Sequence, residues 1–232
     1  MKDHTILVVV CVNNEELFKQ CESQIRNIFV PPGYVVQIFP IRDAQSMASA
    51  YNRALSYPAK YKVYIHQDTY LINRDMFSTL ISLFKENEKL GLIGVAGAQF
   101  LPNNGIWWEG KNLVGKVIEY RRQNYQLLNL DQVFYGNQPF LSVQAIDGLF
   151  MATQYDIPWR EDLFQGFHFY DVSQSLEFQR AGYLIGIPNQ ANLWCIHYNG
   201  DEFDADTYEK YRKVFVEHYK DILSPSQRRD AK

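Results

Sequence analysis

The sequence predicts an α/β fold: a doubly wound mixed sheet, mostly parallel, with helices on both faces. Strand-like and helix-like segments alternate three times within residues 5–95, which is typical of a parallel sheet with right-handed crossovers. The first segment, Thr5–Val12, is a continuous β-branched run, the pattern of a strand buried on both faces. Hydrophobic residues make up 47% of the 232 residues and charged residues 21%, as in a soluble globular chain with a sizeable core.

The regular part of this pattern occupies the first half of the chain. Strands are expected at 5–12, 34–41, 61–65 and 90–95, and helices at 15–28, 44–55 and 74–88. Acidic residues at the start of the first helix suit the helix dipole. Pro31-Pro32-Gly33 interrupts the pattern before the second strand, and Asn73 is expected to cap the third helix.

The second half of the chain is less regular. Residues 99–140 have no clear period, and residues 116–130 fit either a strand pair or a helix. An irregular stretch of this length is usually functional or poorly ordered. Beyond it, strands are expected at 141–146, 149–153, 183–187 and 192–197, and helices at 171–182 and about 206–223. The sequence shows no internal repeat, low-complexity tract or linker, so we expect one domain.

Charge and cysteine content exclude several classes of protein. The net charge is −3 and no basic block occurs, so nothing indicates a nucleic-acid partner. The three cysteines, Cys11, Cys21 and Cys195, form no CxxC pair. This indicates a reducing compartment and the absence of a metal site with thiolate ligands. No apolar stretch reaches the roughly 20 residues of a transmembrane helix. Asp3 lies where a signal peptide would be basic, so we expect a cytoplasmic protein.

Polar side chains follow each of the first three predicted strands, where ligands of open parallel sheets bind. They are Asn13, Asn14 and Glu15; Arg42 and Asp43; and His66, Gln67 and Asp68. His66 and Asp68 can reach one hard divalent cation such as Mg²⁺ or Mn²⁺, with the Asp68 oxygen as the main ligand. The alternative is that Asp68 only caps a turn, which is less favoured because Asn73 already serves the next helix.

Other candidate residues have simple structural explanations. Asp171 and Gln174 have the spacing of a capping box, although a carboxylate fixed at a helix start could also act in catalysis. His197, at a strand end, is either a hydrogen-bonded structural residue or a ligand, and Asp147-Gly148 has the form of a turn. The sequence contains no GxxxxGK[ST] phosphate loop, no dinucleotide fingerprint and no GxSxG elbow.

Six segments, taken in order, resemble a known family. They are Val12-Asn13-Asn14-Glu15, Ser46–Leu55, His66-Gln67-Asp68, Asp147–Met151, Phe167–Asp171 and His197. Together they resemble the family 2 glycosyltransferases of GT-A fold, which is Rossmann-like, and specifically the small bacterial branch named after a streptomycin-biosynthesis protein. The resemblance covers most of the chain. It implies one domain over 1–232, with a nucleotide-binding half at 1–98 and an acceptor-binding half at 99–232.

The resemblance implies a nucleotide-diphosphate-sugar donor, linked to UDP, GDP or dTDP, and a divalent metal, Mn²⁺ or Mg²⁺. The residues it places around the donor are Asn13, Glu15, Asp43, Asn52, Asp68 and Asp147. Asp68 matches the last Asp of the family's DXD metal motif, whereas His66 replaces the first. The late His197 matches a residue that completes the metal shell, so all three are candidate ligands.

The resemblance also implies the reaction. Asp171 matches the family's catalytic base, although Tyr170 stands where an acid usually precedes it. The expected chemistry is a metal-dependent single displacement that inverts the sugar, with a carbohydrate or other hydroxyl as acceptor. The aromatic residues expected against the acceptor are Trp107, Trp108, Phe167 and Tyr170. Surface-polysaccharide assembly in bacteria is the family's commonest setting, and a homodimer is compatible with the sequence.

Two other functions stay open at the level of sequence. One is a non-catalytic protein that binds nucleotide sugars or carbohydrate, since the metal motif is altered. The other is a sugar-nucleotide nucleotidyltransferase. The segment Asn13-Asn14-Glu15-Glu16 disfavours the nucleotidyltransferase, because it is acidic where a triphosphate would bind.

Overall fold

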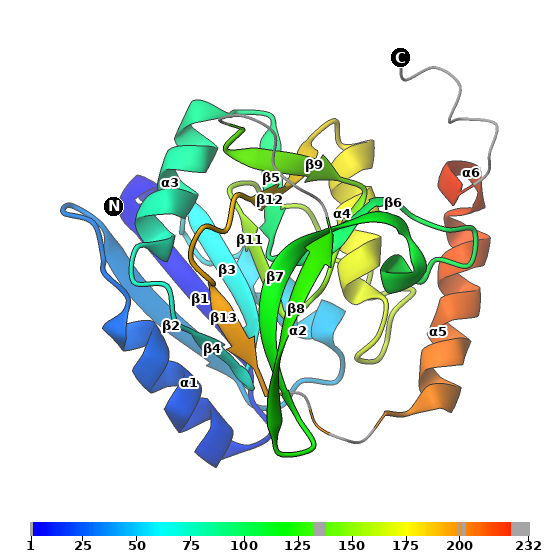
Figure 1. The fold of residues 1–232 in the computed structure, drawn as a ribbon, viewed down its shortest axis with the longest axis horizontal. Helices are drawn as coiled ribbons and strands as arrows, with labels where there is room; N and C mark the ends of the chain where they lie inside the picture. Colours follow the sequence, from blue (N-terminus) through cyan, green and yellow to red (C-terminus); the bar gives the residue numbers. More distant parts are fainter. Residues whose placement is uncertain (1, 132–137, 199, 201–202, 224–232) are drawn as a thin grey trace.

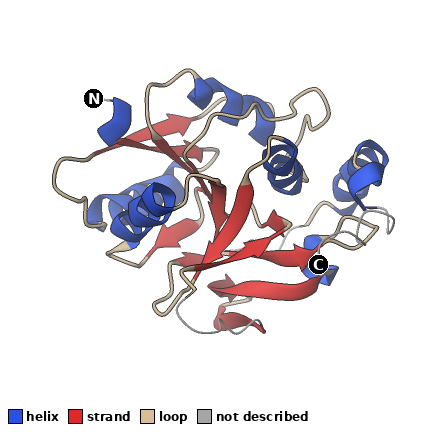
Figure 2. Cartoon of the chain, turned by 90° about the horizontal axis from the view of Figure 1, so that it is seen from above, coloured by secondary structure: helices blue, strands red, loops and turns tan. Residues whose placement is uncertain are grey.

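The structure is a computed structural model that describes residues 2–131, 138–198, 200 and 203–223. Helices surround two sheets (Figures 1 and 2). The larger sheet has the strand order β2-β1-β3-β11-β5-β12-β9. Its strands are β1 (Thr5–Cys11), β2 (Val35–Ile41), β3 (Tyr61–His66), β5 (Leu90–Gly94), β9 (Phe140–Val143), β11 (Phe150–Thr153) and β12 (Leu184–Pro188). Only β11 and β9 run against the others, which confirms a mixed, mostly parallel sheet.

Helices cover both faces of this sheet. The described helices are α1 (Glu15–Asn27), α2 (Met47–Leu55), α3 (Met76–Glu86), α4 (Tyr170–Arg180), α5 (Ala205–His218) and α6 (Lys220–Leu223), with 3₁₀ turns η1 (Lys2–His4) and η2 (Trp107–Glu109). Side chains of a strand alternate between its faces. Accordingly, Val8 of β1 packs in one core cluster with the buried residues of α1 and α3, whereas Val9 packs in a second cluster with those of α2. The doubly wound arrangement is therefore confirmed.

A second sheet was not expected from the sequence. It has the order β10-β6-β7-β13-β4, and β8 pairs with β7 beside this path. Its strands are β4 (Thr69–Leu71), β6 (Ala96–Phe100), β7 (Lys111–Arg121), β8 (Asn124–Asp131), β10 (Ala145–Ile146) and β13 (Cys195–His197). The hairpin β7–β8 decides for the strand pair at residues 116–130 and against the helix. Most of the stretch expected to be irregular is thus ordered, and residues 132–137 lie outside the described part.

Several predicted boundaries were wrong. The strand expected at 141–146 is two strands in different sheets, β9 and β10, separated by Gln144, whose side chain accepts a hydrogen bond from the Leu101 N–H. The helix expected at 206–223 is interrupted at Tyr219. The N-cap of α3 is Asp75 and not Asn73, whose side-chain oxygen instead accepts the N–H of Asp75.

The start of α4 also differs from the prediction. The capping position is Phe169, in the left-handed region at φ 62°, so Asp171 lies in the first turn and is not the cap. Gln174 forms no capping box, because its side chain donates to the Ile157 carbonyl. In the described part of the chain, no helix has the length and apolar character needed to cross a membrane.

Candidate active site

The segment His66-Gln67-Asp68 lies at the carboxyl end of β3, in the turn to β4. The Gln67 side chain connects this turn to the one after β1: its Oε1 accepts the N–H groups of Asn13 and Asn14, each at 3.0 Å. Its Nε2 also donates to the Asn13 side chain. Gln67 therefore fixes the two loops against each other and leaves His66 and Asp68, on either side of it, to face the site.

His197 joins these two residues through the second sheet. Antiparallel pairing of β13 with β4 sets His197 opposite Thr69, next to Asp68. Nδ1 of His66 lies 3.9 Å from Oδ1 of Asp68, and Nε2 of His197 lies 3.6 Å from the same oxygen. One possible ligand atom from each residue falls within 4.8 Å of the other two. Atoms around one ion with bonds of about 2.1 Å lie roughly 3–3.5 Å apart, so a small closure would complete a shell.

Two buried polar atoms of this cluster also favour a role in binding a metal ion. Oδ1 of Asp68 and Nδ1 of His197 are buried and have no hydrogen-bond partner among the residues that the structure describes. A buried polar atom without a partner costs free energy, which a bound cation would relieve at the carboxylate. One carboxylate with two imidazoles suits Mn²⁺ better than Mg²⁺, which prefers oxygen ligands. The residues present therefore fit a divalent metal ion.

The charges of the cluster are mutually dependent. Burial by itself would raise the pKa of Asp68, but the contact with His197 and the nearby His66 outweigh burial and lower it. Burial would lower the pKa of His197, but Asp68 reverses the effect and raises it. For His66, burial dominates and the pKa is lowered. Asp68 is thus held as an anion, and His66 as a neutral ring able to ligate metal.

Tyr170 connects this cluster to the start of α4. Its hydroxyl lies 2.5 Å from Nε2 of His66, which turns Nδ1 of the same ring toward Asp68. Gly148 makes room for the contact, since a Cβ there would collide with the Tyr170 hydroxyl. Asp147-Gly148 is therefore more than the plain turn expected from the sequence. The two departures from the family motif, His66 and Tyr170, are in direct contact.

Asp171 has very different surroundings from Asp68. Its carboxylate accepts the N–H of Gly148 at 2.9 Å and that of Val172 at 2.8 Å. Burial raises the pKa of Asp171 to about 7, and the charge of Asp147 adds to the effect. Both N–H groups oppose the shift without cancelling it. A carboxylate in this state can exchange a proton near neutral pH.

Two cavities meet at this site. The larger cavity, about 540 Å³, includes Asp171, Asp147 and His197 in its wall. The smaller cavity, about 450 Å³, includes Asp68 and Asn13. His66 and Phe167 line both cavities. The cluster of His66, Asp68 and His197, called the metal-type cluster below, therefore lies where the two cavities meet, and the Asp171 carboxylate lies in the larger one.

The residues predicted for the acceptor all line the larger cavity. They are Trp107, Trp108, Phe167 and Tyr170. The residues predicted for the donor are more dispersed. Asn13 and Asp68 line the smaller cavity and Asp147 the larger one, whereas Glu15, Asp43 and Asn52 line neither.

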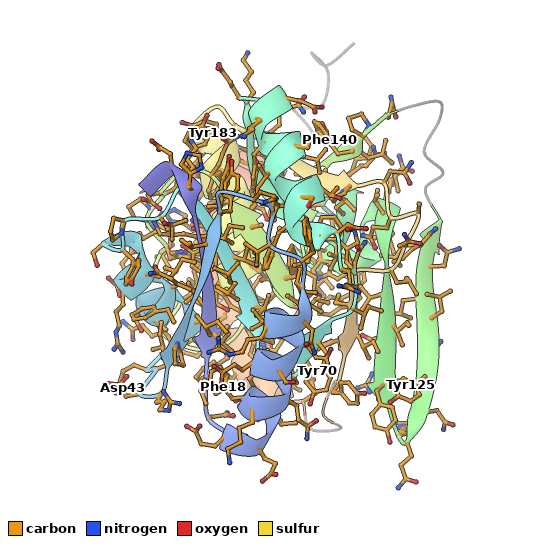
Figure 3. The ribbon with its side chains drawn as sticks, turned by 90° about the vertical axis from the view of Figure 1, so that its left-hand side faces the viewer. Phe18, Asp43, Tyr70, Tyr125, Phe140 and Tyr183 are labelled. Carbon is orange, nitrogen blue, oxygen red and sulfur yellow. The ribbon has the colours of Figure 1, made fainter. Side chains whose placement is uncertain are left out.

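Those three side chains have partners of their own. Glu15 is paired with Arg42 and Asp43 with Arg53, each at 2.6 Å, and Figure 3 shows Asp43 near the outer edge of the molecule. The Asn52 amide donates to the Trp159 carbonyl and accepts its N–H. Their roles in donor binding stay predictions.

Sequence reasoning missed several residues at this site. Glu119, Arg121 and His168 also line the larger cavity. Glu119 and Arg121 alternate on β7 with residues that face away from the cavity. This alternation could not be used for prediction, because residues 116–130 were assigned neither to a strand pair nor to a helix. The hydrogen bonds of Gln67 to the loop after β1 could not be predicted from the sequence, because they depend on a tertiary contact.

Solved glycosyltransferases share this fold. The mannosyltransferase PcManGT from Pyrobaculum calidifontis, in complex with GDP-Man and Mn²⁺, is 10% identical with a TM-score of 0.54, over 93% of this chain and 69% of that one. The catalytic domain of Drosophila β1,4-galactosyltransferase 7, in complex with xylobiose, is 13% identical with a TM-score of 0.54, over 91% and 80%. GalNAc-T7 with UDP, GalNAc and Mn²⁺ is 10% identical with a TM-score of 0.60, over 96% and 51%.

These similarities show that the chain has the GT-A fold. The chain belongs to the glycosyltransferase-like family, whose sequence profile matches residues 7–219. A search of curated proteins found no match. Membership of this family favours the enzyme over the two alternatives left open by the sequence, the non-catalytic binding protein and the nucleotidyltransferase.

Proposed function

We propose that the protein transfers a sugar from a nucleotide-diphosphate donor to an acceptor hydroxyl, with metal dependence and inversion at the sugar carbon. One observation carries the proposal. The metal-type cluster, which is suited to a cation, and the Asp171 carboxylate, which is suited to proton exchange, line adjoining cavities that share His66. Such a division suits single displacement, in which the leaving group and the attacking hydroxyl lie on opposite sides of the reacting carbon.

The proposed donor site is the smaller cavity. His66, Asp68 and His197 would hold the ion where this cavity meets the larger one, and Asn13 would face the nucleotide from the loop after β1. A bound divalent ion supplies neutralisation of the diphosphate charge as the sugar–phosphate bond breaks. PcManGT and GalNAc-T7, solved with Mn²⁺ and nucleotides, support a donor of this kind. The proposed donor is linked to UDP, GDP or dTDP.

The proposed acceptor site is the larger cavity. Asp171 would take the proton of the attacking hydroxyl, a role that its raised pKa suits. Trp107, Trp108 and Phe167 would contact the acceptor. Glu15, Asp43, Asn52 and Asp147 are kept as proposed donor residues on the strength of the sequence resemblance. That resemblance also supports the streptomycin-named branch and a role in surface-polysaccharide assembly, whereas the cysteine content supports a cytoplasmic location.

A thermal-shift screen tests the proposed donor site. The protein is melted with UDP, GDP and dTDP, each with and without Mn²⁺. We expect one nucleotide to raise the melting temperature only when Mn²⁺ is present, because a ligand bound to the native state stabilises it. Equal shifts with and without metal would contradict the proposed ion site. Absence of any shift across the screen would contradict the donor assignment.

A further inference from the structure

One face of the β7–β8 hairpin forms a wall of the larger cavity. Alternate residues of a strand share a face, and the register pairs Val117 with Leu128 across the hairpin. The hairpin residues that line the cavity are Leu113, Val117, Glu119, Arg121, Leu128 and Leu130. Leu127, the neighbour of Leu128, points to the opposite face and is 54% exposed.

The polarity of this wall changes along β7. Glu119 is set opposite His197 in the pairing of β7 with β13, so the charged end of the wall adjoins the metal-type cluster. Leu113 is set opposite Ala98 of β6, six residues earlier. Six residues of strand span about 20 Å. Between them, Ala96 pairs with Gly115, and its carbonyl accepts the N–H of Asp147 near the Asp171 carboxylate. The Asp171 carboxylate therefore lies beside the middle of this wall, with the charged residues to one side of it and the apolar residues to the other.

Exposed aromatic rings extend the apolar lining. Trp108 of η2 is 46% exposed, Phe167 is 54% exposed and Phe203 is 56% exposed, and all three line this cavity. Large apolar side chains gathered in one concave surface mark a binding site, because covering them removes apolar area from water. From the sequence, Trp108 and Phe167 are expected against the acceptor, and the structure adds Phe203 to the same cavity.

Aliphatic side chains do not suit a sugar. Leu113, Leu128 and Leu130 offer neither a flat ring for stacking nor a hydrogen-bond partner. Sugar hydroxyls buried against them would lose water without replacement, which costs free energy. A hydrocarbon chain has the opposite preference.

We propose that the acceptor is amphipathic, with a hydroxyl-bearing head at Asp171 and a hydrocarbon chain along the apolar end of the larger cavity. This inference rests on the proposed function, because the transferase reaction is what requires a hydroxyl at Asp171. Glu119 and Arg121 contact the polar head at the charged end of the wall. The chain runs away from the metal-type cluster over Leu113, Leu128 and Leu130.

The test compares two glycosides that differ only in their aglycone, n-octyl and methyl β-D-glucopyranoside. Binding to the full-length protein is followed by tryptophan fluorescence, with the octyl glycoside kept below its micelle concentration. We expect the octyl glycoside to bind at least tenfold more tightly, because its chain buries apolar area that the methyl group lacks. Equal affinities for the two glycosides would overturn the inference.

A matched pair of variants locates the chain. Leu128→Gln changes a residue that faces the cavity, and Leu127→Gln makes the same change on the opposite face of β8. We expect Leu128→Gln to weaken octyl glucoside binding at least fivefold and Leu127→Gln to leave it unchanged. Equal losses in the two variants would overturn the inference. Should Leu128→Gln fail to fold, Trp108→Ala at the partly exposed ring of η2 takes its place and is expected to lose the same affinity.

Mn²⁺-dependent nucleotide binding, measured on the same samples, separates the two proposals. Nucleotide binding without any preference for the octyl glycoside would overturn this inference alone. Absence of nucleotide binding would overturn the proposed function, and this inference would fail with it. Nucleotide binding that is retained in Leu128→Gln, together with the loss of octyl glucoside affinity, supports both proposals.

Discussion

The region around Asp68 and the region around Asp171 shift the pKa of an aspartate side chain in opposite directions. Asp68 lies between two histidine rings, and its pKa is lowered although burial opposes the shift. Asp171 is held by two backbone N–H groups beside a second carboxylate, and burial raises its pKa to about 7. One carboxylate therefore keeps its charge and attracts cations, while the other binds and releases a proton near neutral pH.

This difference assigns roles that residue type alone cannot assign. Neighbouring carboxylates whose pKa values are moved apart divide the work of acid–base and electrostatic catalysis. Both residues are partly buried, and burial acts to raise the pKa of each; the two histidines reverse the shift at Asp68, whereas the charge of Asp147 adds to it at Asp171. The experiments below ask whether the two regions can be disabled separately.

Asp68→Ala should have the largest effect. It removes the anionic ligand and leaves His66 and His197 with no charge to bind a hard cation. We expect Mn²⁺-dependent nucleotide binding to fall below detection in calorimetry. Asp206→Ala, which changes an exposed carboxylate of α5, is the matched control and should bind normally. Retained metal-dependent binding in Asp68→Ala would show that the cation lies elsewhere.

Asp171→Asn should disable only the other region. The amide keeps the shape of the side chain but cannot accept a proton from the acceptor. A general base contributes about 10²–10⁴-fold to rate, so turnover should fall by that factor while nucleotide affinity is unchanged. Full transfer activity in this variant would refute the base assignment, and a parallel loss of nucleotide affinity would refute the separation of the two regions.

Tyr170→Phe tests the connection between them. Loss of the hydroxyl frees Nε2 of His66, so the ring no longer presents Nδ1 toward Asp68 in a fixed orientation. Removing a partner of a metal ligand costs about 10–100-fold in metal affinity, and we expect a loss in this range for Mn²⁺. Tyr51→Phe is the control, since the buried Tyr51 hydroxyl has no hydrogen-bond partner in the described part of the chain. The same loss in both variants would mean that Tyr170 acts only through packing.

Local periodicity was sufficient to predict the first half of the fold. The β1–α1 and β2–α2 units carry their own strand and helix patterns, and the edge of the sheet follows from their order. The position of His66 and Asp68 at that edge was predicted for the same reason. Their prediction required only that β3 be recognised as a buried parallel strand.

The second sheet could not be predicted in this way, because its turns lack the usual residues. The β7–β8 turn places Arg122 and Gln123 at φ 49° and 63°, where Asn or Gly is the usual signal. Phe169, at the start of α4, likewise adopts φ 62°, although it is neither Asn nor Gly. The approach of His197 to Asp68 depends on the pairing of β13 with β4, a contact between distant segments that no local pattern encodes.

The smallest expected effect is on pH dependence, where the two carboxylates should act with opposite sign. Wild-type turnover should rise about tenfold between pH 6 and 8, as a base with a pKa of about 7 becomes ionised.

Folded Asp171 keeps its proton above pH 4, where the unfolded carboxyl has lost it. The free energy of unfolding should therefore fall as pH rises from about 4 to about 7. Asp68, with its lowered pKa, stabilises the fold above about pH 4 and loses that contribution on acidification.

Comparison with Asp171→Asn isolates the contribution of Asp171 from the other carboxylates. Melting temperatures of the wild type and the variant are measured at pH 5, 6, 7 and 8. The wild type should lose more stability than the variant as pH rises, because only the wild type must ionise a buried carboxylate next to Asp147. Parallel curves for the two proteins would mean that Asp171 ionises as easily when folded as when unfolded. The contrast between the two regions would then come from the position of the side chains and not from their charge.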